Sequence, residues 1–190
     1  MKAWSVIAAV AALGISGCQQ AAVASGAGDP PQTAPQRVSP LGVGFDHPDG
    51  QQLRPCDGDA PFCMVASDPA AEEFMRDLFT VEVHEGALEA VAAKEAGFVR
   101  NADGKLMTTW GRFMPVEVES FRVNGNPGLR AVISCGISDP ETGFHAAGGE
   151  CLWAVVSDGE RTAVISSSGF GNGLEAAEAA IASLRFLPLE

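Results

Sequence analysis

The side chains that could take part in catalysis are three histidines and a run of serines. His47, His84 and His145 are far apart in the sequence, and none of them belongs to a recognisable pair. The serines at 166–168 could supply a nucleophile beside His84 or His145, but a triad is a spatial arrangement that one sequence does not show. No zinc-protease, nucleophile-elbow, Walker or kinase motif is present. The sequence therefore favours a binding protein over an enzyme, and we expect no cofactor.

Acidic residues form two small clusters that could hold a cation, Asp46 with Asp49 and Asp57 with Asp59. Neither cluster reproduces the calcium-loop pattern D-x-[DN]-x-[DN]-G followed by a distant glutamate. Aspartate beside glycine is the usual composition of a turn. We therefore expect turns at both places and no metal site.

The N-terminal segment holds a cysteine in a specific setting. After the basic residue Lys2, an apolar run extends from Ala3 to Ile15, which is shorter than the roughly 20 residues of a membrane span but typical of a signal peptide. The letters ISGC that end at Cys18 resemble the lipobox of bacterial lipoprotein precursors. This resemblance covers only the first 18 residues. It implies that residues 1–17 are removed and that Cys18 carries acyl chains such as palmitate.

A lipid anchor would place the protein in the bacterial cell envelope. Glutamines follow Cys18, with no aspartate to resemble the inner-membrane retention signal, so the resemblance implies the periplasmic face of the outer membrane. The alternative is an ordinary secretory signal that is cleaved near Ala24, which would discard Cys18.

The other four cysteines suggest disulfides, because an even number remains in an exported chain once Cys18 is set aside. Four cysteines allow three pairings. Local geometry favours Cys56 with Cys63 and Cys135 with Cys151. A zinc site would need closely spaced cysteine pairs or histidines at matching spacing, and the chain lacks both.

Composition divides the chain after the anchor into a tether and a head. Residues 18–40 are the lipidated cysteine and a segment rich in Ala, Gly, Gln and Pro, which cannot bury enough surface to offset chain entropy and should form a flexible tether. Residues 41–190, about 150 in number, have the usual size of one globular domain.

The chain is acidic, with a formal net charge of −12, and it would lose a further positive charge if Lys2 leaves with the signal peptide. This charge argues against binding to nucleic acid, which needs a basic surface. It also argues against electrostatic docking on anionic lipid, so membrane contact would depend on the anchor. A basic protein partner, in contrast, would be steered toward the head.

Two helical patterns precede the strands. The letters SDPAAEEFMRDLF, residues 67–79, predict a helix with Phe74 and Leu78 on its apolar face. A second helix is predicted from about Glu85 to Ala96, with Gly97 as its stop. The segment before them, from about residue 44 to 63, has too many Pro, Gly and Asp residues for regular structure.

The pattern then changes to the period of strands. The letters KLMTTW, FMPVEVESFRV, LRAVISCGI, CLWAVVS and RTAVISSS predict about five mostly antiparallel strands. NGNPG predicts a turn, and Asp158-Gly159 predicts a two-residue hairpin. A third helix closes the chain, with Asn172 as its cap and an apolar stripe of Leu174, Ala177, Ile181 and Leu184.

The central strands are apolar on both faces, so helices or long loops should cover both. Ile133, Trp153 and Val164 should share one face, and the other should carry Val132, Leu152, Ala154, Val156 and Ile165. If Cys135 lies opposite Cys151, Ile133 lies opposite Trp153. We predict a single α+β or α/β sandwich with about five mostly antiparallel strands and two or three helices. A run of strands followed by a closing helix resembles the small sandwich of the PsbP and Mog1 type.

The connection between two core strands, residues 138–150, is the predicted binding loop. It carries Phe144 and His145 among small residues, and a Cys135–Cys151 bridge would close its base. Loops held on a rigid sheet often carry recognition, although many surface loops have no such role.

Together these features predict a non-catalytic envelope lipoprotein whose head binds another protein. The partner would be an envelope-assembly protein, or a wall-targeting enzyme that the head inhibits or confers immunity against. The alternative is a membrane-anchored periplasmic hydrolase with an unrecognised active site.

Changing Cys18 to Ala should release the protein from membranes, because the acyl chains would attach through this side chain. Fractionation of cells in detergent-free buffer measures the release. A Cys18→Ala variant that still pellets with the membranes would contradict the lipid anchor.

Overall fold

The computed structural model describes residues 36–38, 42–47, 50–57, 62–108, 110, 114–138 and 145–188. All of them belong to the unit Thr33–Glu190. The expected signal peptide, Cys18 and nearly all of the expected tether lie outside the described residues. Within the described residues, neither α-helix has the length and apolar character needed to span a membrane.

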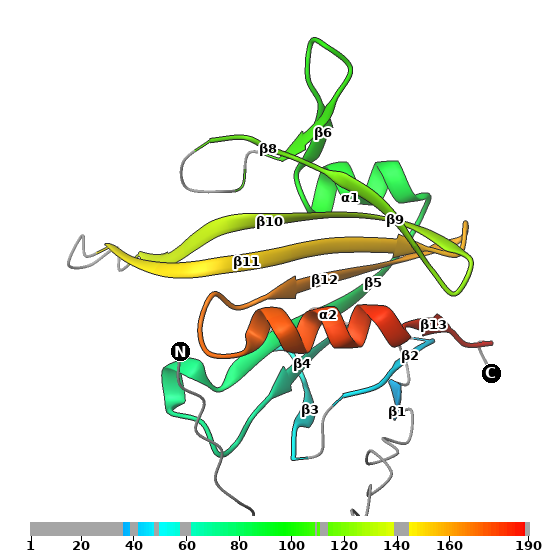
Figure 1. The fold of residues 1–190 in the computed structure, drawn as a ribbon. Coiled ribbons are helices and arrows are strands. Elements are labelled where there is room, and N and C mark those ends of the chain that lie inside the picture. The colour runs from blue at the N-terminus through cyan, green and yellow to red at the C-terminus, as the bar shows by residue number, and fades with distance from the viewer. Residues whose placement is uncertain are drawn as a thin grey trace, which may run out of the picture. The chain divides into compact units, whose positions relative to one another are not determined.

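A seven-stranded antiparallel sheet forms the centre of this unit (Figure 1). Each strand pairs antiparallel with its neighbours. In spatial order the strands are β3 (Gln52–Pro55), β4 (Cys63–Ser67), β5 (Asp77–Glu85), β12 (Arg161–Ser167), β11 (His145–Ser157), β10 (Asn126–Ser138) and β9 (Glu119–Val123).

Two three-stranded sheets and two helices surround the central sheet in the described part of the chain. One small sheet contains β1 (Gln36–Val38), β2 (Val43–Phe45) and β13 (Arg185–Phe186), and the other contains β6 (Phe98–Arg100), β7 (Leu106–Thr108) and β8 (Val116–Glu117). The helices are α1 (Leu88–Glu95) and α2 (Gly173–Ser183), and Glu73–Met75 forms a short 3-10 turn. The predicted α+β, sandwich-like, mostly antiparallel architecture is confirmed.

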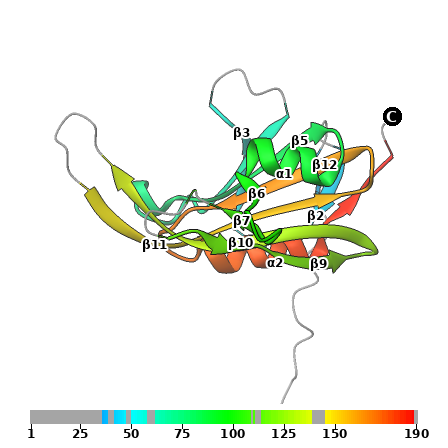
Figure 2. The ribbon, with the colours of Figure 1, turned by 90° about the horizontal axis from the view of Figure 1, so that it is seen from above.

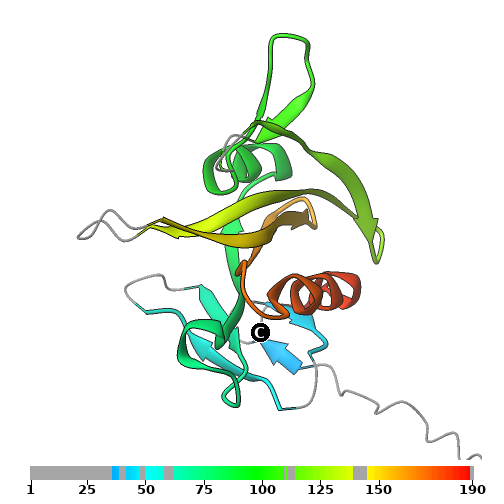
Figure 3. The same ribbon diagram turned by 60° about the vertical axis from the view of Figure 1, so that its left-hand side comes forward.

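The helices lie on opposite faces of the central sheet (Figures 1 and 3). On the α2 face, residues of β2, β5, β11 and β12 form one core with the alanines of α2. On the α1 face, a second core joins α1 and β6 to β10, β11 and β12. The predicted division of the core strands between two faces is confirmed, although Val132 on the α2 face remains 38% exposed.

The helix predicted at residues 67–79 is wrong. Ser67 ends β4, and Leu78 and Phe79 belong to β5, where both are almost fully buried. The connecting loop is held by Asp68, whose N–H donates to Arg76 O at 2.8 Å and whose side chain accepts from Ala70 N–H at 2.9 Å. Pairing of β5 with β4 and β12 therefore overrides the local helical pattern.

The expectation of irregular structure between residues 44 and 63 is also wrong in part. β2 and β3 both lie there, and Val43 and Phe45 of β2 are fully buried against α2 and β5. β2 pairs with β13, so its partner comes from the far end of the chain. The other helices lie where they were predicted, with α1 shorter than expected and Gly97 at φ 63° after it.

The predicted pairing of β10 with β11 is shifted by two residues. Ile133 lies opposite Cys151 rather than opposite Trp153, so the disulfide joins Cys135 and Cys151 diagonally across the two strands. A bulge between Ser134 and Gly136 then shifts the register by one residue. A shift of two residues returns every side chain to the same face, so the assignment of faces is unaffected.

The turn between β11 and β12 lies one residue later than predicted. Asp158 N–H donates to Arg161 O at 3.1 Å, so Gly159 and Glu160 are the two loop residues. Gly159 has a φ of 103°. A glycine with positive φ at the first loop position is the arrangement of a type II′ turn.

Arg161 joins this turn to the two chain ends of the unit. Its guanidinium donates to Asp158 Oδ2 at 2.7 and 3.0 Å. It also donates to Gly42 O at 3.2 Å and to Leu187 O at 3.0 Å, and it lies 5.2 Å over the Phe186 ring. The start of β12 is thereby tied to the small sheet of β1, β2 and β13.

The Asp158 carboxyl has a pKa below its ordinary value. Burial of the side chain, which is 20% exposed, raises the pKa. Hydrogen bonds from the Arg161 N–H and guanidinium and from the Glu160 N–H outweigh this effect because they stabilise the carboxylate.

Asp158→Ala should lower the free energy of unfolding at neutral pH by about 1–3 kcal/mol, because a charged acceptor of several hydrogen bonds is lost. A carboxylate whose pKa is lower in the folded state stabilises the fold above its unfolded pKa of about 4, and this contribution disappears as the pH falls through the folded pKa. Urea unfolding at several pH values should therefore show a constant difference from the wild type above about pH 5 that shrinks below about pH 4.

Asp103→Ala is the matched control, because Asp103 lies in another turn and its carboxylate contacts no hydrogen-bond or ion-pair partner among the described residues. This variant should be as stable as the wild type. A stability difference for Asp158→Ala that persists unchanged into acid would contradict the assignment.

Candidate functional site

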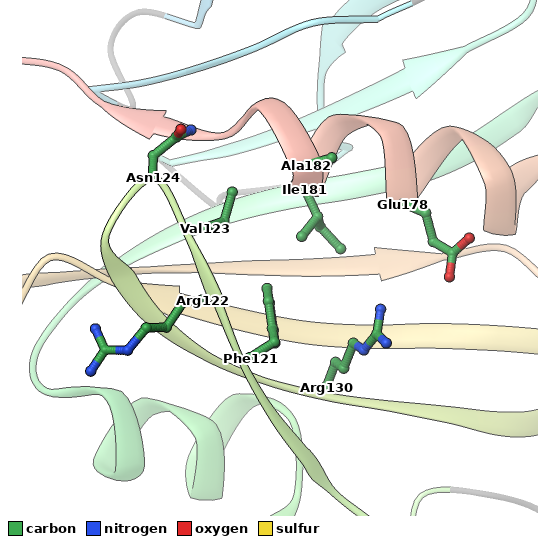
Figure 4. A pocket seen from close by; sticks show the side chains of 8 residues that line it. All are labelled: Phe121, Arg122, Val123, Asn124, Arg130, Glu178, Ile181 and Ala182. Atoms are coloured by element: carbon green, nitrogen blue, oxygen red, sulfur yellow. The ribbon is translucent and has the colours of Figure 1, made fainter.

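A groove lies between α2 and the strands β9 and β10 (Figure 4). Its volume is about 460 Å³. We call it the α2–β9 groove; its lining residues are Phe121, Arg122, Val123, Asn124, Arg130, Glu178, Ile181 and Ala182. It is the candidate functional site because it combines apolar and charged side chains from elements of different parts of the chain.

The turn between β9 and β10 closes one end of the groove. Asn124 and Gly125 form a two-residue loop between Val123 and Asn126, and both loop residues have positive φ, 48° and 84°. This is the pattern of a type I′ hairpin, and it confirms the turn predicted from NGNPG. The Asn124 side-chain amide donates to Leu184 O at 2.8 Å, which holds the turn against the end of α2.

Phe121 forms the floor of the groove and lies on Gly128 of β10. A Cβ atom at position 128 would lie 2.6 Å from the Phe121 ring and 2.9 Å from Val155 O. Glycine is therefore required at this position for the ring to lie flat on the sheet. Ile181 of α2 points toward the ring from the opposite wall (Figure 4).

Two opposite charges flank this apolar floor. The Arg130 guanidinium lies 5.8 Å from the centre of the Phe121 ring, and its Nε donates to Glu119 Oε2 at 3.2 Å. Glu178 of α2 extends toward Arg130 across the groove, whereas Arg122 points away and donates to Gly125 O at 3.0 Å (Figure 4). The groove therefore offers an apolar centre with a cation and an anion at its rim.

The groove exists because α2 covers only part of the sheet. The buried face of α2 consists mainly of alanines, which bring the helix close to β5, β11 and β12. Its side toward β9 and β10 carries Glu178, Ile181 and Ala182, which line the groove. Val132, which follows Arg130 on the same face of β10, stays exposed for the same reason.

The predicted binding loop does not form as expected. β10 and β11 continue their pairing to Ser138 and His145, so residues 145–150 belong to a strand rather than to a loop. Phe144 lies outside the described residues, as does the side chain of His145. The ladder extends on both sides of the Cys135–Cys151 bridge, which therefore does not mark the base of the connection.

The cysteine pairs favoured from the sequence are those joined in the structure. Disulfides connect Cys56 with Cys63 and Cys135 with Cys151, with Cα atoms 5.4 and 5.7 Å apart. The first joins the end of β3 to the start of β4, and the second joins β10 to β11 beside the bulge.

The serines proposed as nucleophiles have structural partners. Ser166 Oγ lies 2.6 Å from Thr80 Oγ1 on β5, Ser167 Oγ accepts from Leu152 N–H at 2.8 Å, and Ser168 Oγ donates to Phe170 O at 3.2 Å. These contacts hold β12 and the loop after it to their neighbours. They do not bring a described histidine ring against a serine hydroxyl.

His84 lies between two carboxylates on the α1 face. Its Nε2 is 3.1 Å from Glu82 Oε2, and its Nδ1 is 3.7 Å from Glu95 Oε1. A hydrogen bond from Lys94 lowers the pKa of Glu95 and outweighs the opposing effect of burial. This cluster links β5 to α1.

The two acidic clusters of the sequence are not assembled as cation sites in the described residues. Asp46 lies 3.6 Å from the guanidinium of Arg185, and Asp57 lies 3.6 Å from that of Arg54. Asp49 and Asp59 lie outside the described residues. Within those residues, no group of three or more His, Cys, Asp or Glu side chains has a metal-binding arrangement.

Sequence reasoning missed the α2–β9 groove. The letters FMPVEVESFRV alternate in Val116–Glu119 and predict a half-exposed strand, and NGNPG predicts the turn after it. No sequence pattern indicates that α2 packs beside this turn, because the Asn124–Leu184 contact joins residues 60 positions apart.

No protein-family model and no curated protein matches the chain. A solved structure from Bacteroides thetaiotaomicron is similar at 11% identity and a TM-score of 0.49; the match covers 82% of this chain and 49% of that one, so this chain spans about half its length. The PsbP protein of Synechocystis (CyanoP) is similar at 12% identity and a TM-score of 0.49, over 80% of this chain and 91% of that one.

Asn124→Gly should lower the free energy of unfolding by about 1 kcal/mol, because glycine keeps the left-handed backbone but loses the hydrogen bond to Leu184. Asn124→Ala should lower the free energy of unfolding by about 1 kcal/mol more than Asn124→Gly, because alanine is strained at positive φ. Urea unfolding of both variants separates the hydrogen bond from the backbone conformation. A fully stable Asn124→Gly variant would show that the hydrogen bond does not hold the hairpin.

Proposed function

We propose that the protein is a lipid-anchored lipoprotein of the bacterial cell envelope, on the periplasmic face of the outer membrane, and that its head binds a partner protein in the α2–β9 groove. The anchor is Cys18, and residues 19–40 form the tether. The role of the head is binding rather than catalysis.

Two features support the envelope location. The apolar run and the letters ISGC ending at Cys18 resemble a lipoprotein signal. The disulfides Cys56–Cys63 and Cys135–Cys151 are of a kind that persists in oxidising compartments such as the periplasm.

The observation that carries the binding function is the lining of the α2–β9 groove. Phe121 and Ile181 form an apolar centre, and Arg130 and Glu178 lie at its rim. Protein-binding sites combine an apolar centre, often aromatic, with a polar and charged rim that selects the partner. The α2–β9 groove has this arrangement. It therefore suits a partner segment that carries both apolar and charged side chains.

The charge of the chain supports a basic partner. A formal net charge of −12 on 190 residues attracts cationic proteins over distances comparable with the Debye length. A basic wall hydrolase would fit an inhibitory or immunity role. A component of envelope assembly would fit an accessory role.

The Phe121→Ala variant should lose its partner. The full chain, purified in detergent and immobilised, is exposed to an extract of periplasm and membranes at moderate salt, and mass spectrometry identifies the proteins retained. We expect the wild type to retain one envelope protein, and truncation of Phe121 to remove most of the apolar contact on which binding depends.

Phe74→Ala is the matched control, because Phe74 is 60% exposed and lies in the loop between β4 and β5, outside the groove lining. This variant should retain the partner as the wild type does. The proposal would be contradicted if Phe121→Ala and the wild type retained the envelope protein equally. It would also be contradicted if none of the three proteins retained any.

A further inference from the structure

β9 lies at an open edge of the central sheet and borders the α2–β9 groove (Figure 2). Within the described residues, β10 is the one strand that pairs with it. The opposite edge, β3, ends in Pro55, which has no N–H group to offer a further strand. β9 contains no proline, so its backbone keeps every donor and acceptor.

The β9–β10 turn determines which backbone groups of β9 face outward. Val123 and Asn126 close a two-residue turn and therefore form a hydrogen-bonded pair. Bonding alternates along an antiparallel strand, so Phe121 bonds to β10 and the N–H and C=O groups of Ser120 and Arg122 point away from it. No described residue bonds to these outward groups. An edge with free donors and acceptors is a template for an added strand.

The groove lies where the side chains of an added strand would go. Alternate residues of such a strand would project onto the α2 face, beside Phe121 and Val123. Glu119 lies on the same face at the other end of β9, and its side chain is 69% exposed despite the contact with Arg130. The surface therefore suits apolar residues opposite Phe121 and Val123 and a lysine or arginine opposite Glu119.

A second copy of the chain is a poor occupant of this edge. Two heads with a formal net charge of −12 on each chain repel one another, whereas a basic segment is attracted. The free backbone groups of β9 suit an extended segment, and the charge of the chain suits a basic one. The occupant is therefore an extended segment of a basic partner.

We infer that the partner binds by strand addition to β9, through an extended segment that pairs with Ser120 and Arg122, places apolar side chains beside Phe121 and Val123 at the α2–β9 groove, and places a basic side chain opposite Glu119. This inference rests on the proposed function of the groove and adds the backbone pairing. Strand addition supplies affinity through main-chain hydrogen bonds, and the groove supplies the sequence preference.

The probe is a phage-displayed library of short linear peptides, selected on the full chain in detergent. We expect the enriched peptides to alternate between apolar and polar residues, with a lysine or arginine at one end. Hydrogen exchange should show that a bound peptide protects the amides of Ser120 and Arg122, because these N–H groups become hydrogen-bonded.

Two variants of position 120 separate backbone from side chain. Ser120→Pro removes an outward N–H group without breaking the ladder to β10. The affinity for the peptide should therefore fall by about tenfold or more. Ser120→Ala keeps the N–H group and should leave the affinity unchanged. N-methylation of the peptide at the amides that face β9 should weaken binding to the wild type in the same way, with no change to the protein.

The outcomes separate the inference from the proposed function. Loss of binding with Phe121→Ala, with Ser120→Pro and with the N-methylated peptide supports both strand addition and the groove as the binding site. Loss with Phe121→Ala alone, with unprotected Ser120 and Arg122 amides, overturns strand addition and leaves the groove as the binding site. A library that yields no peptide dependent on Phe121 overturns both.

Discussion

The α2–β9 groove depends on one hydrogen bond between two elements that are distant in the sequence. Asn124 adopts the left-handed conformation that its hairpin turn needs, and its side-chain amide donates to Leu184 O at 2.8 Å, directly after α2. Leu184 is fully buried, so the turn is held against a packed part of the core. With the turn held there, Phe121 of β9 and Arg130 of β10 lie across the groove from Glu178 of α2 (Figure 4). Together with the packing of Val123 in the same core as Ile181, this contact holds the hairpin beside the helix.

The rest of the fold supplies the rigid frame for this contact. The central sheet is buried on both faces, by α2 and the small sheet of β2 on one side and by α1 and β6 on the other. Arg161 ties the turn of β11 and β12 to the residues that flank β2 and β13. The disulfides lie at the β3–β4 connection and between β10 and β11, away from the groove lining. Among the described residues, β9 pairs with β10 alone, so its outer edge adjoins the groove without a covering strand.

Local patterns predicted the elements whose own residues determine their conformation. The apolar stripe of α2 and the turn at Asn124 and Gly125 are confirmed, as are the faces of β10, β11 and β12. The helix predicted at 67–79 failed because Leu78 and Phe79 are buried by strands on both sides of β5, a tertiary effect that its helix-forming letters do not reveal. The groove was missed for the same reason, because its walls come from segments about 50 residues apart or more and meet only in the fold.

The central claim is that the partner contacts the α2–β9 groove in the living cell. The most direct test replaces Phe121 with a photo-crosslinking phenylalanine analogue in the full chain and irradiates intact cells. The account predicts a crosslink from position 121 to one envelope protein, and none from the same analogue at position 74. Crosslinks from position 74 to that protein, or none from position 121, would contradict it.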